Sequence, residues 1–137
     1  MVNLAFYLPM NKKFIITASF FGILAVIAGA FGAHGLKAYL SPQQLEVWHT
    51  AVQYQFYHVF ALLFLSTLAP AKNKLVNASY SFFTLGIIFF SGSLYLLACR
   101  DILKLDWLWV MGPLTPIGGL FFILGWLMLL LYAVKRK

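Results

Sequence analysis

Charged residues are scarce in this 137-residue sequence. Asp, Glu, Lys and Arg make up 9% of it, whereas hydrophobic residues make up 63%. Soluble domains usually contain about 25% charged residues, so the composition excludes a water-soluble protein. Only three residues are acidic, against ten Lys and Arg. These cations are spread over short segments between long apolar runs, which argues against a nucleic-acid-binding surface.

Catalytic and redox motifs are also missing. The single cysteine, Cys99, has no partner for an internal disulfide and no neighbour at metal-ligand spacing. The sequence contains no HExxH, GxSxG or P-loop pattern. All three acidic residues lie in or near loops, whereas ion-coupled transporters usually place carboxylates within their spans. We therefore predict a protein that is not an enzyme, with no cofactor and no metal site.

Four apolar runs are long enough to cross a bilayer as helices, which takes roughly 20 residues each. Backbone amides in hydrocarbon must be paired within their own segment, so helices are expected and open strands are not. The sequence predicts an all-α membrane protein with one domain, residues 1–137, and a bundle of four transmembrane helices. The expected spans are residues 14–33, 51–69, 78–99 and 116–134.

The distribution of Lys and Arg predicts the orientation. Seven of these residues lie before the first span, between the second and third, and after the fourth. The two other loops hold three, together with all the acidic residues. By the positive-inside rule both termini are expected in the cytoplasm.

Capping signals predict where two of the helices begin. Ser41, Pro42 and Gln44 form a capping-box pattern, so the second helix should begin near residue 42, before the membrane. Thr115 followed by Pro116 fits the N-cap of the fourth helix. Residues 106–114 would then form a short outer interfacial segment anchored by tryptophans. A single kinked helix from residue 105 is the alternative.

Small residues recur at heptad spacing in the first and third spans. Such stripes allow another helix to approach closely where lipid removes the usual hydrophobic drive. We predict that both faces are used for helix packing, and the partner is either another helix of this chain or a second copy. The expected packing residues are Ala18, Gly22, Ala25, Gly29 and Gly32 in the first span, and Ser79, Gly86 and Ser93 in the third.

Polar residues near the outer ends of the spans are the candidate site. On the predicted topology they converge in the outer leaflet, as a polar packing core or a small binding pocket. The candidates are His34, His49, Gln53, Gln55, His58, Ser91, Ser93, Tyr95 and Thr115. His58 is either a proton-accepting or ligand-binding imidazole, or a neutral histidine hydrogen-bonded to Ser91, Ser93 or Tyr95. His49 and His58 lie nine positions apart on a helix, about 180° around it, and cannot share one ion.

Four motifs in order resemble the YgdD/YwdK family of small membrane proteins. They are GAFGAHGL at 29–36, TAVQYQ at 50–55 followed by YH at 57–58, SGSLY at 91–95, and TPIGG at 115–119 with GW at 125–126. The resemblance covers nearly the whole chain after Met10, a plausible translation start that makes residues 1–9 an expected extension. It implies a bacterial inner-membrane protein, or a mitochondrial one in animals, of unknown function.

Two functional classes follow as hypotheses. The first is a non-catalytic membrane module that assembles with itself or with a larger membrane complex, with the lipid bilayer as its other partner. The alternative is a carrier or channel for a small solute or lipid that uses the outer polar pocket. An intramembrane enzyme or redox helper that uses His58 is a third hypothesis.

Overall fold

The computed structural model describes residues 10–68, 73–104 and 112–135, and within these ranges it contains helices and no strand. An all-α fold is thereby confirmed. The elements are α1 (Lys12–Ala33), α2 (Pro42–Thr67), α3 (Lys74–Gly86), the π-helix η2 (Ile87–Ser91), α4 (Gly92–Ala98), α5 (Arg100–Leu103) and α6 (Leu114–Lys135). The expectations for residues 1–9 and for the interfacial segment, including Trp107 and Trp109, fall outside the described residues.

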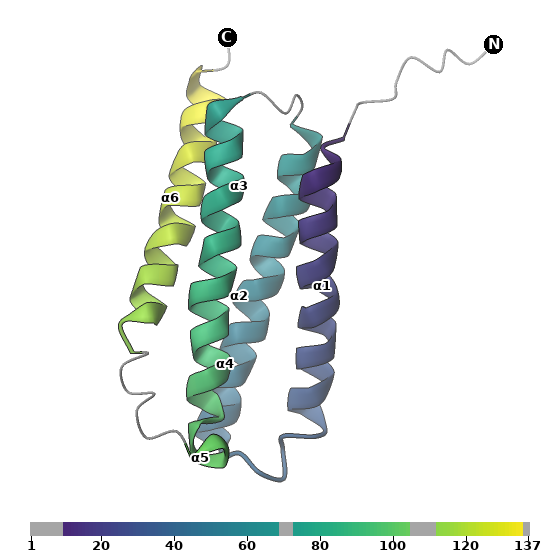
Figure 1. The fold of residues 1–137 in the computed structure, drawn as a ribbon, viewed down its shortest axis with the longest axis vertical. Helices are drawn as coiled ribbons and strands as arrows, with labels where there is room; N and C mark the ends of the chain where they lie inside the picture. Colours follow the sequence, from purple (N-terminus) through teal and green to yellow (C-terminus); the bar gives the residue numbers. More distant parts are fainter. Residues whose placement is uncertain (1–9, 69–72, 105–111, 136–137) are drawn as a thin grey trace, which may run out of the picture.

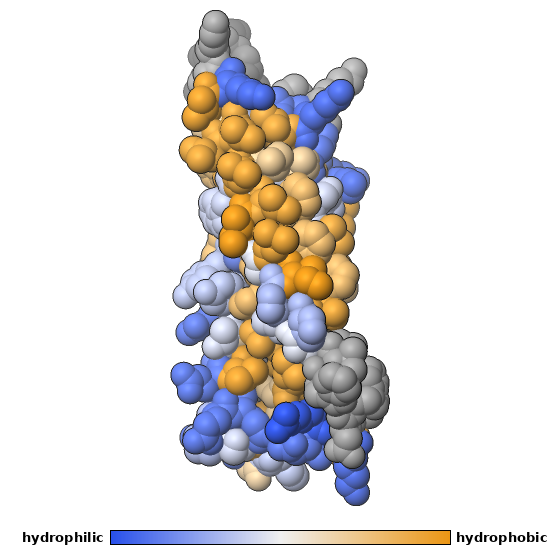
Figure 2. All heavy atoms as spheres, turned by 90° about the vertical axis from the view of Figure 1, so that its left-hand side faces the viewer, coloured by the Kyte–Doolittle hydropathy of each residue, from blue (hydrophilic) through white to orange (hydrophobic). Residues whose placement is uncertain are grey.

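Four long rods lie side by side: α1, α2, the continuous α3–η2–α4 rod, and α6 (Figure 1). Successive rods run in opposite directions. The first residue of α1 and the last residue of α6 lie at one end, called here the terminal end. The opposite end carries α5 and is called the α5 end (Figure 1). The α6 side of the molecule shows a broad hydrophobic band between hydrophilic ends (Figure 2).

Among the described residues, three helical segments are long and apolar enough to cross a membrane: Lys12–Ala33, Lys74–Ala98 and Leu114–Lys135. The predicted second span is not among them. Its helix, α2, has 26 residues, but Gln53, Gln55 and His58 lower its mean hydropathy. Whether α2 also crosses the bilayer therefore stays a prediction.

A capping box begins α2, as the sequence predicts. The Ser41 hydroxyl accepts a hydrogen bond from the Gln44 amide (3.3 Å), and the Ser41 amide donates to Gln44 Oε1 (2.9 Å). Pro42 occupies the first helical position, where its missing N–H is not needed. These contacts satisfy amide groups that would otherwise have no partner at a helix start.

The start of α6 differs from the prediction. Gly112 and Pro113 form a turn and the helix begins at Leu114, two residues before the expected span. Thr115 is thus inside the first turn and is not the N-cap. Its hydroxyl bonds to the Ser93 hydroxyl at 2.7 Å. The turn also interrupts the alternative, a single kinked helix from residue 105, of which residues 105–111 lie outside the described part of the chain.

The small-residue stripe of α1 faces α2 of the same chain. Ala18 and Ala25 are fully buried, and a Cβ atom built on Gly29 would lie 3.6 Å from Val52 Cγ1. At Gly32 the added atom would lie only 2.6 Å from the Trp48 ring. The stripe is therefore occupied by an intramolecular contact, and several large side chains on the other side of α1, such as Phe20, Ile23 and Ile27, are exposed.

Helices α3 and α6 also pack through small residues, and each helix contributes a glycine that lies against an aromatic ring of the other. Gly86 receives the ring of Phe122 from α6, and Gly125 receives the ring of Phe83 from α3. The Ser79 hydroxyl donates to the Gly125 carbonyl oxygen at 2.9 Å. Side chains from α1, α2, α3, η2 and α6 then fill the terminal half of the bundle with an apolar core.

Candidate functional site

The predicted outer polar cluster is divided in the structure into separate contacts. One of them joins three rods through Gln55, whose side chain is 3% exposed. Its Nε2 donates to the Phe21 carbonyl oxygen of α1 at 2.7 Å, and its Oε1 accepts from the Tyr95 hydroxyl of α4 at 2.9 Å. Beside it, Trp48 Nε1 donates to the Ala28 carbonyl oxygen at 2.8 Å. Buried polar groups are costly unless paired, so these bonds fix α1 and α4 against α2.

His58 lies in a different contact, between α2 and α6. Its Nδ1 is 2.8 Å from the Tyr54 carbonyl oxygen, and its Nε2 is 3.3 Å from Trp126 Nε1. A carbonyl oxygen can only accept and an indole N–H can only donate. The two contacts therefore define a neutral imidazole with its proton on Nδ1. The expected alternative of a hydrogen-bonded histidine agrees with this geometry, but the partner is Trp126 and not Ser91, Ser93 or Tyr95.

Aromatic rings surround the His58 imidazole. Phe122 stacks on it with ring centroids 3.5 Å apart and planes 5° apart. Phe83 of α3 lies 5.3 Å away and Trp126 lies 6.2 Å away, both at steep angles. The histidine is 4% exposed and does not face lipid.

Serine residues make the third set of contacts, where η2 and α4 meet α6. Ser93 donates to the Phe90 carbonyl oxygen at 2.9 Å and also bonds to Thr115. Ser91 is 1% exposed, and its hydroxyl has no hydrogen-bond partner among the described residues. It is the last residue of the π-helix η2, where the backbone departs from regular α-helical spacing.

Three of the predicted residues do not join these contacts. His34, His49 and Gln53 are exposed at or near the α5 end of the bundle. Gln53 and Gln55 point to different sides of α2, as their spacing of two predicts. Within the described ranges, no three His, Cys, Asp or Glu residues come close enough to hold a metal ion.

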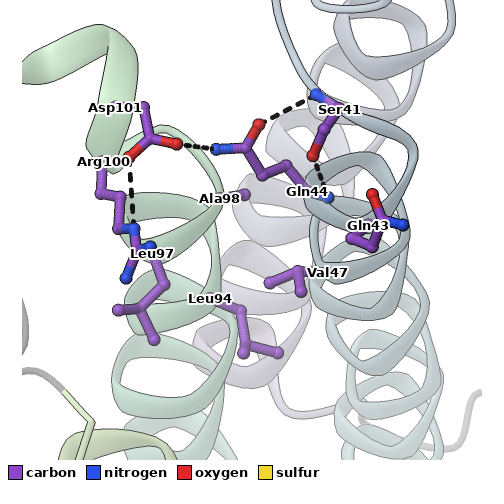
Figure 3. A pocket seen from close by; sticks show the side chains of 9 residues that line it. All are labelled: Ser41, Gln43, Gln44, Val47, Leu94, Leu97, Ala98, Arg100 and Asp101. Carbon is purple, nitrogen blue, oxygen red and sulfur yellow. Dashed lines mark hydrogen bonds and ion pairs between the residues drawn. The ribbon is translucent and has the colours of Figure 1, made fainter.

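An open pocket of about 450 Å³, lined by both polar and apolar side chains, lies at the α5 end, between the start of α2 and the end of α4 (Figure 3). Gln44 Nε2 donates to Asp101 Oδ2 at 2.7 Å, and Asp101 Oδ1 lies 3.3 Å from Arg100 Nε. Both side chains of the ion pair are more than half exposed, and exposed pairs of this kind contribute little stability. The contacts tie the cap of α2 to α5 without forming an enclosed binding site.

Two hollows of different character open between the rods. An apolar groove of about 460 Å³ lies between α1 and the η2–α4 segment, with Gln55 and Tyr95 on its inner side. A hollow of about 610 Å³ lies between α2 and α6, with His58 on its inner side.

The sequence analysis did not predict Trp126 as the hydrogen-bond partner of His58. The only feature of the sequence that pointed to Trp126 was the GW motif at 125–126.

The fold and these contacts define an all-helical membrane protein in which most buried polar side chains are paired inside the chain. Residues 28–119 match the family model described as "Protein of unknown function (DUF423)". The chain belongs to the UPF0382 membrane protein family, which includes YwdK, and the predicted family membership is thereby confirmed.

Similarity to individual relatives extends over nearly the full length. UPF0382 membrane protein YwdK of Bacillus subtilis is 41% identical over 90% of this chain and 98% of its own. A UPF0382 membrane protein of Staphylococcus haemolyticus is 43% identical over 90% and 97%, and one of Staphylococcus aureus is 44% identical over the same shares. No solved structure matches significantly.

Proposed function

We propose that this protein is a non-enzymatic module of the bacterial inner membrane that assembles with a second copy of itself. In this proposal all four rods cross the bilayer and both termini lie in the cytoplasm. The observation that carries it is the open groove between α1 and the η2–α4 segment.

Charge supports the orientation. Among the described residues, the terminal end carries Lys12, Lys13, Lys74 and Lys135 and no acidic residue. The α5 end carries Lys37, Arg100 and Lys104, together with Glu46 and Asp101. The excess of positive charge at the terminal end favours its retention in the cytoplasm.

The internal contacts of α2 support its crossing of the bilayer. Its 26 residues correspond to about 39 Å of helix, more than the roughly 30 Å of a hydrocarbon core. Gln55 and His58, which reduce its apolar character, are buried and hydrogen-bonded inside the bundle. These two residues therefore add no unpaired polar surface toward lipid.

The groove and the exposed side chains of α1 beside it, called here the α1 ridge, are both apolar. The groove is lined mainly by apolar side chains of α1 and of the η2–α4 rod, and Gly92 leaves open space on its wall. Next to it, α1 presents Phe20, Ile23 and Ile27, which are 57%, 61% and 59% exposed. Their spacing places them on one side of the helix.

Two copies inserted with the same orientation can bury both features at once. A two-fold axis along the membrane normal would place the α1 ridge of each copy in the groove of the other, as in an isologous interface. In lipid, association depends on close packing, and a ridge that fits a groove provides it.

The tightly packed apolar core in the terminal half of the bundle argues against the alternative, a carrier whose pathway runs through a single chain. Phe14, Leu62, Leu65 and Phe83 are at most 2% exposed there. The polar contacts in this half, Thr17 with the Tyr80 hydroxyl and Ser79 with the Gly125 carbonyl oxygen, are separate pairs and do not form a continuous polar lining among the described residues.

Cysteine cross-linking tests the dimer in membranes. Two tagged versions with Cys99→Ala are co-expressed, one carrying Ile23→Cys and the other Ile88→Cys, which lies on the groove. We expect a cross-linked dimer on oxidation. The matched control replaces Ile88→Cys by Leu130→Cys, an equally apolar and exposed position on α6, and should give none. Equal yields from both pairs, or a monomeric mass in mild detergent, would contradict the proposal.

Filling the groove gives an independent check. A Cβ atom on Gly92 meets no atom within 4 Å, so Gly92→Leu is tolerated by the single chain but projects a side chain into the groove. We expect the dimer association constant to fall by about tenfold, as an overpacked contact predicts. A dimer unaffected by Gly92→Leu would place the interface elsewhere, and a stoichiometric complex with another protein would favour the larger-complex hypothesis.

A further inference from the structure

The hollow around His58 has the features of a binding site that the proposed assembly does not use. It measures about 610 Å³ and lies between α2 and α6, away from the α1 groove. Pockets for small molecules typically combine apolar walls with a few converging polar groups. Here the walls are aromatic, and the polar groups are His58, the Tyr54 hydroxyl and the Trp126 indole N–H.

The hydrogen-bond acceptor of this hollow, His58 Nε2, has only a long hydrogen bond to its present donor. His58 Nδ1 is committed to the Tyr54 carbonyl oxygen, so Nε2 is the remaining acceptor of the ring, and it is turned toward Trp126, which also lines the hollow. Its present partner, Trp126 Nε1, is 3.3 Å away, beyond the usual upper limit of about 3.2 Å for a strong N–H bond. A ligand hydroxyl can therefore donate to Nε2 without breaking a strong bond.

A donor lies on the same hollow. Tyr54 is 39% exposed, and its hydroxyl forms no hydrogen bond with any other residue in the described part of the chain. Its ring packs 4.7 Å from Phe90 and 6.3 Å from Phe122. The hollow thus offers one acceptor, one unused hydroxyl and several ring faces within a single cluster.

The rim of the hollow is apolar and exposed. Leu120, Ile123 and Trp126 of α6 are 53%, 65% and 50% exposed. In the proposed topology these side chains face acyl chains, so a ligand reaches the hollow through the bilayer. Gly119 lies on the wall and keeps space open, since a Cβ atom there would only come into ordinary contact with the Phe90 ring at 3.9 Å.

We infer that the hollow binds a lipid-soluble hydroxyaromatic molecule, such as a phenol or hydroquinone. Its ring packs against the rings of Tyr54, Phe90 and Trp126, which line the hollow, where aromatic pairs gain stability beyond simple burial. Its hydroxyl donates to His58 Nε2, and the Tyr54 hydroxyl provides a donor for a second oxygen. The inference concerns binding only and assigns no reaction to His58.

The test compares two probes that differ in one hydrogen-bond donor. Full-length protein labelled with ¹⁵N-histidine is titrated in detergent micelles with 2-naphthol and with 2-methoxynaphthalene, which cannot donate to Nε2. We expect 2-naphthol to move the ¹⁵Nε2 signal of His58, and to bind about fivefold to tenfold more tightly than the ether. The exposed His34 and His49 provide internal references whose signals stay unchanged.

Two variants locate the binding. Gly119→Leu fills the hollow and should abolish the His58 response, whereas Gly92→Leu, on the opposite groove, should leave it intact. Equal responses to both probes, or a response that survives Gly119→Leu, would overturn the inference and indicate partitioning into the micelle. The result is distinguishable from that of the dimer test, because Gly92→Leu affects only the dimer and Gly119→Leu only the ligand.

Discussion

The glycines of this bundle differ in whether the structure leaves space for a side chain at their position. A Cβ atom on Gly118 would lie 2.3 Å from the Phe90 backbone nitrogen and 2.6 Å from its Cα, so neither helix can yield by rotating a side chain. A Cβ atom on Gly92 would meet nothing within 4 Å. The two positions have the same residue type and opposite tolerance.

Gly118→Ala should therefore destabilise the protein by about 3 kcal/mol, at the upper end of the cost of overpacking. Gly92→Ala should be neutral or slightly stabilising, because alanine favours helix more than glycine does. Thermal unfolding in detergent, followed by tryptophan fluorescence, compares the two variants. Equal midpoints for both would contradict the close approach of α6 to η2.

The sequence predicted the direction of some polar side chains but not the partners that they contact. The spacing of Gln53 and Gln55 indicated different directions, and one is exposed while the other is buried. The pairing of His58 with Trp126 was not predictable, because it depends on how α6 is rotated against α2. A long apolar helix with little amphipathic pattern does not reveal that rotation.

At the scale of elements, the hydrogen bond between Tyr95 and Gln55 joins α4 to α2 inside the bundle. Tyr95→Phe removes the donor and leaves Gln55 Oε1 without it in an apolar surrounding. We expect a loss of about 1 kcal/mol, in the range measured for hydrogen bonds between membrane helices. A drop in the unfolding midpoint of this variant checks the expectation.

Tyr57→Phe is the matched control for that variant. Tyr57 lies on the same rod as Gln55, is 57% exposed, and its hydroxyl forms no hydrogen bond within the described residues. Its unfolding midpoint should not change. If both tyrosine variants behaved alike, the Tyr95 bond would have no measurable role.

Helix positions were largely predictable and helix irregularities were not. The capping pattern at Ser41 and Gln44 placed the start of α2, since cap chemistry is local. The start of α6 was misplaced because Thr115 also fits an N-cap, yet its hydroxyl bonds across to Ser93. The π-helix η2 left no local signal, because it accompanies the close approach of Gly118 from another rod.

At the scale of the molecule, the proposed topology predicts the accessibility of single cysteines in intact cells. With Cys99→Ala as background, a cysteine at Lys37 should react with a membrane-impermeant maleimide, and a cysteine at Lys74 should react only after lysis. The reason is the excess of positive charge at the terminal end. Reversed labelling would overturn the orientation while leaving the fold intact.

Tyr80 fastens α1 to α3 near the terminal end. Its ring stacks on Phe14 with centroids 4.1 Å apart, and its hydroxyl bonds to Thr17 at 2.8 Å. Beyond that point α1 packs extensively only against α2. About 24 Å of helix lies between Thr17 and Ala33, so a tilt of about 10° pivoting at Tyr80 displaces the far tip by about 4 Å. This aromatic contact at the terminal end thus limits how far α1 can separate from the η2–α4 segment at the α5 end.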